Sequence, residues 1–355
     1  MNPFFSIIVP CCDVAPYLRE CLDSVVKQPF SDWECLLGVE ESKDDTEKIA
    51  REYATKDPRF RVFAGPRTGS CSASRNTGID MAAGEYIIFL DGDDTIVEGS
   101  LQRLHDKIAA RPGADLYPCA MEVYDNQTGK VIDHRDNYPP NFSDELTGPK
   151  ATVDLSSRLF YPCPMLQLSV FRRLFLVDNG LKCIYGLRNQ DSEFSPRALY
   201  LARRVIPLHE AFYLYRIRGG SVQTSAKSYG HFYRDWSVIL ESLFAFHAKV
   251  SAEPGFDRAV TKSWSRTWLS TLFIKWFSKD FVSKVPRAER LEYLIKMFPR
   301  GMDDFDSLLA GCGSMPRRIA GWWVKAFVRH AIARPMAEAF FTMLYFPIVQ
   351  LKRAS

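Results

Sequence analysis

The sequence predicts an α/β fold in which a mostly parallel sheet is flanked by helices and followed by a helical C-terminal extension. Short apolar runs typical of strands alternate with helix-period segments over residues 1–110. From about residue 230 onward, helical periodicity dominates and prolines separate the segments. The composition, 46% hydrophobic and 25% charged over 355 residues, is that of a globular protein with one large or two modest domains.

The alternation in residues 1–110 defines the elements in order. Pro10 is expected to end the first strand, because proline cannot donate to the ladder. The first and last strands are apolar throughout, which is typical of the centre of a sheet covered on both faces. The expected strands are 5–9, 33–39, 60–64 and 85–90, and the expected helices are 17–27, 44–56 and 72–83.

Ligands of such open sheets bind beyond the carboxyl ends of the strands. The candidate binding loops are therefore 10–13, 40–42, 65–69 and 91–94. The last loop brings the carboxylates of Asp91, Asp93 and Asp94 together, and such crowding is relieved by a divalent cation of the kind used in nucleotide chemistry. The alternative is a solvated Asp-Gly turn.

The remaining chain carries less regular signals. Residues 111–150 are rich in turn residues, with strand-like runs at 115–124. We expect one domain of residues 1–226, with halves of about 1–110 and 111–226, and an α-helical region of residues 227–355.

Cysteine usage and the lengths of the apolar runs predict the compartment. The nine cysteines are scattered without the spacing of a zinc site or a disulfide scaffold, which favours a reducing cytoplasm. The N-terminal residues lack the basic and apolar regions of an export signal. No run reaches the roughly 18 uninterrupted apolar residues of a spanning helix. We therefore expect a cytoplasmic protein.

Four motifs carry a family resemblance. They are Ser6-Ile-Ile-Val-Pro10, Tyr17-Leu-Arg-Glu-Cys-Leu-Asp-Ser-Val, Gly69-Ser-Cys-Ser-Ala-Ser-Arg-Asn-Thr-Gly78, and Gly84-Glu-Tyr-Ile-Ile-Phe-Leu-Asp-Gly-Asp-Asp94. In this order and spacing, over about residues 4–225, the chain resembles the family-2 glycosyltransferases of the GT-A fold, in particular those of bacterial surface polysaccharides. The resemblance implies an inverting transferase that takes a sugar from a nucleotide-sugar donor, with UDP favoured, and uses Mn²⁺ or Mg²⁺ on the diphosphate.

The resemblance also assigns residues to the donor site. Pro10, Asp13 and Glu40 would hold the nucleoside, and Arg75 would face the nucleotide. For Arg75 the alternative is an ordinary surface arginine on a helix.

The acidic turn corresponds to the family's Asp-x-Asp motif. Asp93 would be the direct metal ligand, and Asp91 would contact the ribose or a metal-bound water, with Gly92 between them in the nucleotide-sugar site. The resemblance therefore implies that Asp91 and Asp93 both belong to the metal site.

The resemblance places the catalytic base at Asp191. The family's base is an Asp in a Glu-Asp pair that opens a later helix, and Gln190-Asp191 stands at that place. An inverting transfer needs one carboxylate to take the proton of the acceptor hydroxyl. A helix N-cap is the alternative role for Asp191, and the two roles are compatible. Arg216 and Arg218 follow on a strand, where they either contact an anion or face solvent.

Three departures from the family pattern keep a second hypothesis open. Cys12-Asp13 replaces an aromatic-polar pair, which removes a stacking surface for the nucleobase of the donor. Val39-Glu40 replaces an Asp-Asp pair. Gln190 replaces the Glu beside the base. The alternative to an enzyme is a catalytically inactive glycosyltransferase-like module that binds a partner or organises a complex.

Charge is distributed unevenly along the chain. Residues 1–110 carry a balance of −7 and residues 111–355 a balance of +11 within the net +4. The segment 315–353 combines seven of these basic residues with bulky apolar ones, as in segments that lie on an anionic membrane surface. That pattern would suit a glycan or lipid-linked acceptor, with helical packing or an oligomer interface as the alternatives. Nucleic acid is not expected, because no binding motif is present.

Overall fold

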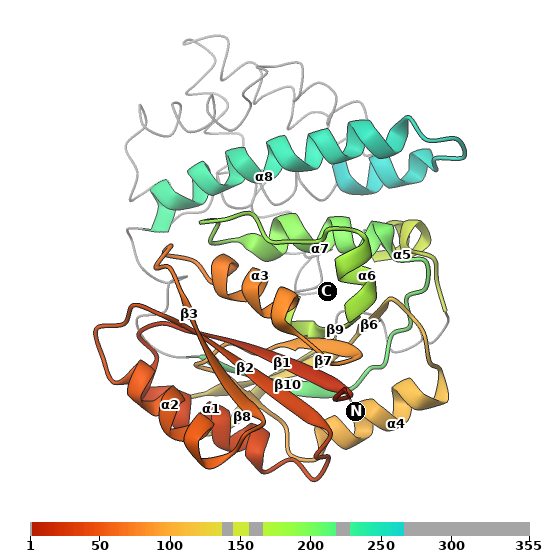
Figure 1. The fold of residues 1–355 in the computed structure, drawn as a ribbon. Coiled ribbons are helices and arrows are strands. Elements are labelled where there is room, and N and C mark those ends of the chain that lie inside the picture. The colour runs from red at the N-terminus through yellow and green to blue at the C-terminus, as the bar shows by residue number, and fades with distance from the viewer. Residues whose placement is uncertain (1, 137–144, 156–165, 218–227, 266–355) are drawn as a thin grey trace. The chain divides into compact units, whose positions relative to one another are not determined.

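The computed structural model describes residues 2–136, 145–155, 166–217 and 228–265 (Figure 1). The chain divides into two compact units. One unit consists of Met1–Ala151 with Cys163–Ser221, and the other of Thr152–Pro162 with Val222–Ser355.

The first unit is built around a six-stranded sheet in the order β3-β2-β1-β4-β9-β6. The first four strands of this order run parallel, and β9 pairs antiparallel with both β4 and β6. The strands are β1 (Phe5–Cys11), β2 (Trp33–Glu40), β3 (Phe60–Gly65), β4 (Tyr86–Phe89), β6 (Leu116–Pro118) and β9 (Ser169–Arg172). Every residue of β1, β2 and β4 is buried, as expected of strands that are covered on both faces.

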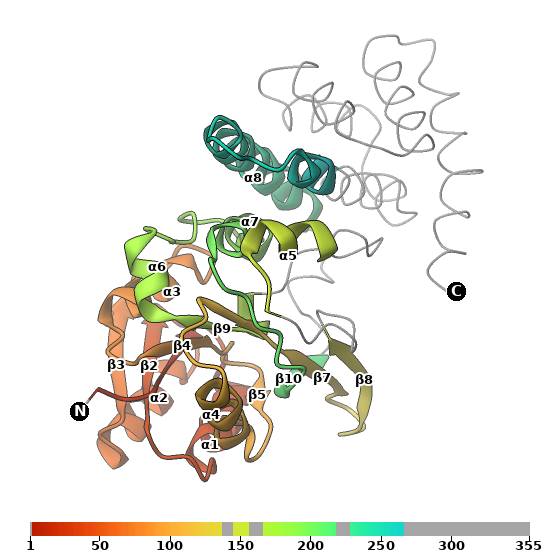
Figure 2. The same cartoon turned by 90° about the vertical axis from the view of Figure 1, so that its right-hand side faces the viewer.

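Helices cover both faces of this sheet. In Figures 1 and 2, α1, α2 and α4 lie on one face and α3 and α6 on the other. The helices of the unit are α1 (Ala15–Val26), α2 (Thr46–Lys56), α3 (Ser72–Met81), α4 (Ser100–Ala110), α6 (Arg173–Asp178) and α7 (Gln190–Leu201). The approach of α3 to the sheet is close, since a Cβ added to Gly78 would lie 2.5 Å from a methyl carbon of Ile8.

A smaller sheet follows in the order β5-β10-β7-β8. Its strands are β5 (Thr95–Ile96), β7 (Ala120–Asp125), β8 (Val131–Asp136) and β10 (Ala211–Ile217). Strand β5 comes directly after the acidic turn and pairs with β10. The turn is therefore joined to the large sheet at one end and to the small sheet at the other.

The predicted α/β class with a mostly parallel sheet is confirmed, with each expected element of the first 110 residues present within about two residues of its expected ends. The expected end of the first strand is wrong. Pro10 lies within β1, paired with Gly38 of β2, while the pairing of β1 with β4 stops at Ile8. Pro10 has a strand neighbour on one side only, which is the position where proline is tolerated in a sheet.

The described part of the second unit is helical. Helix α8 spans Ser228–Ser251, and residues 258–265 are helical as well. Helix α5 (Gly148–Leu155) crosses the division between the units, and within the second unit Ser263 Oγ donates to the carbonyl of Thr152 at 2.8 Å. None of the helices in the described residues is long and apolar enough to cross a bilayer. Residues 315–353 lie outside the described residues.

Candidate active site

The acidic turn lies at the carboxyl end of β4, against the end of β1. A Cβ added to Gly92 would lie 3.0 Å from the carbonyl oxygen of Pro10, so the turn lies close against β1 and a larger residue would require the backbone there to shift. Close backbone packing therefore accounts for a glycine at position 92, and its place in the donor site stays a prediction. Pro10 itself is buried in the sheet beneath the turn.

Both carboxylate oxygens of Asp91 are held by protein donors. Arg75 Nη2 lies 2.5 Å from Oδ1, and Gln167 Nε2 donates to Oδ2 at 2.7 Å. The Arg75 side chain is 5% exposed and that of Asp91 is 24% exposed. Arg75 is therefore a buried partner of the acidic turn, and the alternative of a surface arginine is excluded.

Asp94 is held on β10 by two hydrogen bonds. Tyr213 Oη donates to Asp94 Oδ2 at 2.5 Å, and the backbone N–H of Arg216 donates to Oδ1 at 2.8 Å. Burial raises the pKa of Asp94 well above its usual range. Of the three crowded carboxylates, Asp94 serves to anchor the turn on β10, and Asp91 and Asp93 remain at the partly exposed edge of the sheet.

The remaining donor set suits a hard divalent cation that is completed by a substrate. In the described ranges no group of three or more His, Cys, Asp or Glu side chains is arranged to hold a metal. Mg²⁺ and Mn²⁺ in nucleotide sites are commonly bound by one or two carboxylates together with substrate phosphates. Asp91 and Asp93 can supply those carboxylates. The expected division of roles, with Asp93 as the direct ligand, is compatible with the contacts of Asp91, whose two oxygens lie against Arg75 and Gln167.

Asp191 lies in the first turn of α7, which begins one residue earlier at Gln190. Its Oδ1 accepts from the backbone N–H of Ser192 at 2.9 Å, and Asn189 occupies the N-cap position. Burial raises the pKa of Asp191, the positive charge of Arg75 lowers it, and the negative charge of Asp91 raises it. The charges of Arg75 and Asp91, about one hundred positions earlier in the chain, thus affect the pKa of Asp191.

Gln190 joins the start of α7 to the start of α3. Its side chain is buried, and with the amide oxygen turned toward α3 it accepts from the backbone N–H groups of Cys71 and Ser72, each at 3.2 Å. These are N–H groups at a helix start that the helix itself leaves unsatisfied. A neutral amide performs this structural task, so the departure at Gln190 leaves Asp191 in place beside α3.

Glu40 closes the end of β2 as a buried carboxylate. Thr68 N donates to Oε2 at 3.3 Å and Ser74 Oγ to Oε1 at 3.2 Å. Burial raises the pKa of Glu40. The predicted nucleoside residue therefore faces the loop after β3 and the helix α3, at the carboxyl ends of the parallel strands.

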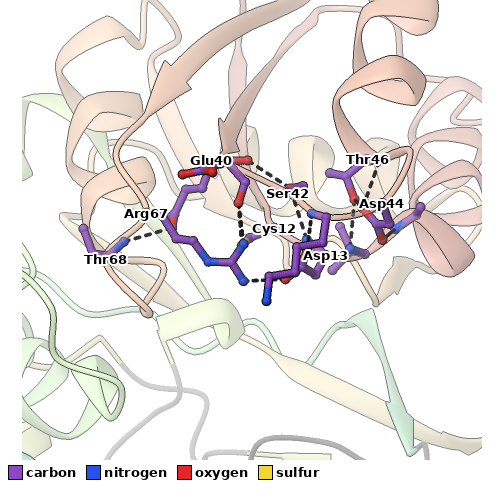
Figure 3. Close-up of polar contacts among 12 residues, drawn as sticks. Cys12, Asp13, Glu40, Ser42, Asp44, Thr46, Arg67 and Thr68 are labelled. Atoms are coloured by element: carbon purple, nitrogen blue, oxygen red, sulfur yellow. Dashed lines mark hydrogen bonds and ion pairs between the residues drawn. The ribbon is translucent and has the colours of Figure 1, made fainter.

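Asp13 lies at the end of β1 in the left-handed backbone region, with φ of 51°. Its Oδ1 accepts from the N–H of Lys43 at 2.6 Å, and its Oδ2 lies 2.6 Å from Arg67 Nη2 (Figure 3). The backbone hydrogen bond from Lys43 and the contact with Arg67 lower the pKa of Asp13. Asp13 is thus an ionised group that joins the loops after β1, β2 and β3.

Sequence reasoning missed three residues of this region. Gln167 and Arg67 each hold an aspartate across a gap of more than 50 residues, and Tyr213 holds Asp94 across 119 residues. No local pattern marks such partners, although the placement of Arg67 in a candidate binding loop was a usable signal. The solvent-facing alternative for Arg216 is wrong, because its side chain is buried, with Glu20 Oε2 at 2.7 Å and the carbonyl of Asp93 at 2.7 Å. Its contact with a substrate anion stays a prediction. Arg218 lies outside the described residues.

Comparisons with known proteins agree with this architecture. Residues 6–165 match the family model "Glycosyl transferase family 2". The uncharacterized glycosyltransferase EpsJ of Bacillus subtilis is 34% identical over 225 residues, or 61% of this chain and 62% of EpsJ. A Campylobacter jejuni GalNAc(5)-diNAcBac-PP-undecaprenol beta-1,3-glucosyltransferase is 31% identical over 61% of this chain and 65% of its own length. The chain thus covers less than two thirds of these two relatives.

Among solved structures, S. aureus TarS 1–349 in complex with UDP-GlcNAc has a TM-score of 0.70 at 19% identity, covering 96% of this chain and 91% of that one. At this identity the likeness concerns the fold. The fold is thus an α/β fold of the GT-A type, with the candidate ligand loops at the ends of the parallel strands. The similarity to glycosyltransferase family 2 thus covers residues 6–165, less than half of the chain.

Proposed function

We propose that the protein transfers a sugar from a nucleotide-sugar donor, with UDP as the favoured nucleotide, to a glycan or lipid-linked acceptor in surface-polysaccharide (capsule) biosynthesis. The transfer is metal-dependent and inverts the anomeric centre. One observation carries the proposal. Gln190, next to Asp191, accepts hydrogen bonds from the backbone N–H groups of Cys71 and Ser72 at the start of α3, and the same helix carries Arg75, the partner of Asp91 at the acidic turn.

In this proposal Asp191 accepts the proton of the acceptor hydroxyl as that oxygen attacks the anomeric carbon. Asp91, fixed by Arg75 and Gln167, orients the ribose, and Glu40 and Asp13 lie at the nucleoside end of the site. Mn²⁺ or Mg²⁺, when bound at Asp93, supplies charge stabilisation for the leaving diphosphate.

The choice of donor and acceptor draws on the relatives. TarS is solved with UDP-GlcNAc and with UDP, and the C. jejuni relative acts on an undecaprenol-linked glycan according to its name. The general chemistry of the site, with the carboxylates of the acidic turn and a buried arginine paired with Asp91, is compatible with this substrate class.

The second candidate is a catalytically inactive binding or scaffold module. The observation that favours it is Cys12, which stands where the family has an aromatic side chain for stacking of the nucleobase. Gln190 no longer favours it, because the amide is used to join α7 to α3. A direct test of donor binding separates the two candidates.

We expect UDP with Mn²⁺ to raise the thermal unfolding midpoint by about 5 °C at one hundred times its dissociation constant, because a ligand that binds only the native state stabilises it. The measurement is a thermal-shift screen of UDP, GDP, CDP and ADP, each with and without Mn²⁺. Mn²⁺ alone is the control. An unchanged midpoint with every nucleotide, together with no sugar transfer, contradicts the enzyme proposal.

We also propose that residues 1–226 form the transferase domain and that residues 227–355 add a helical region. Within that region, the basic and apolar segment 315–353 would contact the inner face of the cell membrane, which would give a cytoplasmic protein peripheral membrane association. Deleting the residues after 315 is then expected to move most of the protein from the membrane fraction to the soluble fraction. Unchanged fractionation of the shortened protein contradicts this part of the proposal.

A further inference from the structure

Polar contacts join the loops that follow β1, β2 and β3 into one cluster (Figure 3). We call the residues Cys12, Asp13, Glu40, Ser42, Arg67 and Thr68 the loop cluster. Asp13 N donates to Ser42 Oγ at 3.2 Å, and Ser42 Oγ donates to the carbonyl of Glu40 at 2.9 Å. The three loops are therefore fixed relative to one another at the sheet edge where open α/β sheets bind ligands.

Arg67 is held at both ends of its guanidinium fork. Nη2 lies 2.6 Å from Asp13 Oδ2, and Nη1 donates to the carbonyl of Glu41 at 2.7 Å. Because the guanidinium is planar, two contacts from different nitrogens set the direction of the plane. The side chain remains 34% exposed, so part of it is accessible to a ligand. Figure 3 shows Arg67 reaching from its own loop past Cys12 toward Asp13.

Asp13 is placed for this contact at a cost in backbone energy. A φ of 51° is uncommon for a residue other than glycine, and such conformations persist where the surroundings impose them. The conformation puts the carboxylate between Lys43 N and Arg67 Nη2. Asp13 therefore acts as the anchor that fixes the guanidinium plane.

No residue of the loop cluster has an aromatic side chain. Cys12 presents a thiol, and both oxygens of the Glu40 carboxylate already accept hydrogen bonds from Thr68 and Ser74. A nucleobase needs a flat partner for its face, and an arginine guanidinium serves as one because it is planar and weakly hydrated. Within the cluster, Arg67 is the exposed side chain that offers a fixed plane.

We propose that the Arg67 guanidinium is the surface on which the nucleobase of the donor stacks, and that Asp13 is the residue that positions it. The inference rests on the proposed function, because it concerns the nucleotide of that donor. It explains how the site binds a base without an aromatic residue at Cys12.

The test is the substitution Arg67→Lys, which keeps the charge and removes the plane. By calorimetry with Mn²⁺ present, UDP is expected to bind about tenfold more weakly, whereas inorganic pyrophosphate, which has no base, keeps its affinity within twofold. Arg59→Lys is the matched control. Arg59 is also 34% exposed and lies 2.7 Å from an aspartate, Asp57, but it precedes β3 at the opposite end of the strand. Its substitution should leave UDP binding unchanged.

Asp13→Asn provides a second, independent variant. Asparagine retains an oxygen for the N–H of Lys43 but loses the ion pair with Arg67, so UDP binding should weaken by a smaller factor. The double variant should bind UDP only slightly more weakly than Arg67→Lys alone, because both substitutions act through the plane of the Arg67 guanidinium. Additive losses in the double variant contradict the positioning role of Asp13.

The outcomes separate this inference from the proposed function. Wild-type UDP affinity in Arg67→Lys, or an equal loss for UDP and pyrophosphate, overturns the stacking role while the transferase proposal stands. A wild-type protein that binds no nucleoside diphosphate and transfers no sugar overturns the proposed function and this inference together.

Discussion

Replacing Asp191 with asparagine is expected to lower kcat for sugar transfer at least about 100-fold, while the dissociation constant for UDP changes less than about threefold. Asparagine has the same shape and still offers an oxygen to the N–H of Ser192, so α7 should begin as before. It cannot accept the proton of the acceptor hydroxyl. The measurements are the release of UDP during transfer and calorimetry with UDP and Mn²⁺.

Asp80→Asn serves as the control for this substitution. Asp80 is an exposed aspartate on α3 that pairs with Lys182, and neutralising it changes the charge of the unit by the same amount. It should leave kcat unchanged. Full transfer by Asp191→Asn would remove Asp191 from the catalytic role and leave it as a residue of the first helical turn.

The pH profile gives a further readout of the same substitution. Burial raises the pKa of Asp191, and a general base works only when it is deprotonated. In the wild type, kcat/KM should therefore fall as the pH drops through that raised pKa, at a higher pH than an ordinary aspartate would give. Asp191→Asn should lose this limb of the profile.

Asp91→Asn is expected to lower the stability of the protein without ligand, and Asp93→Asn is expected to weaken the effect of Mn²⁺ on UDP binding. Asp91 is the partner of Arg75, whose side chain is 5% exposed, so neutralising Asp91 leaves a buried positive charge without its carboxylate. Breaking a buried ion pair in this way destabilises a protein by about 3 kcal/mol. Asp91→Asn should therefore lower the free energy of unfolding of the protein without ligand by about that amount, as measured by urea unfolding.

Asp93→Asn should behave in the opposite way. Its effect on unfolding without ligand should stay within about 1 kcal/mol, because Asp93 is partly exposed and its backbone carbonyl contact with Arg216 is retained. The variant should lose most of the additional stabilisation that Mn²⁺ gives to UDP binding. If Asp93→Asn retains the full effect of Mn²⁺ and Asp91→Asn loses it, the assignment of the two aspartates must be reversed.

The large sheet could be predicted from the sequence because its strands are short, apolar and separated by regular helices. The second sheet could not, because β5 has two residues and β7 and β10 are joined through pairing across about 90 positions. Such pairing depends on contacts that no local pattern records. The same limit explains why Pro10 was expected to end β1, since the early end of β4 beside it is a property of the assembled sheet.

The candidate site divides in the same way. Asp91 and Asp93 stand out because carboxylates crowded at the end of a buried strand suggest metal chemistry, whereas Asp191 is assigned through the family resemblance alone. Gln167 and Arg67 do not stand out, because a single glutamine and an arginine in a loop are ordinary in a sequence. Their importance comes from the aspartates that they contact in space.

The way in which the acidic turn is held also sets the smallest piece of the chain that can carry the site. The Asp-x-Asp sequence is complete by residue 94, yet Gln167 holds one of its carboxylates and Tyr213 holds the neighbouring one. A fragment of the chain that ends at residue 165, where the family match ends, would contain the motif but neither of these donors. The candidate site therefore needs residues from across the range 5–216. An exchange of segments between relatives must move the acidic turn together with Gln167 and Tyr213.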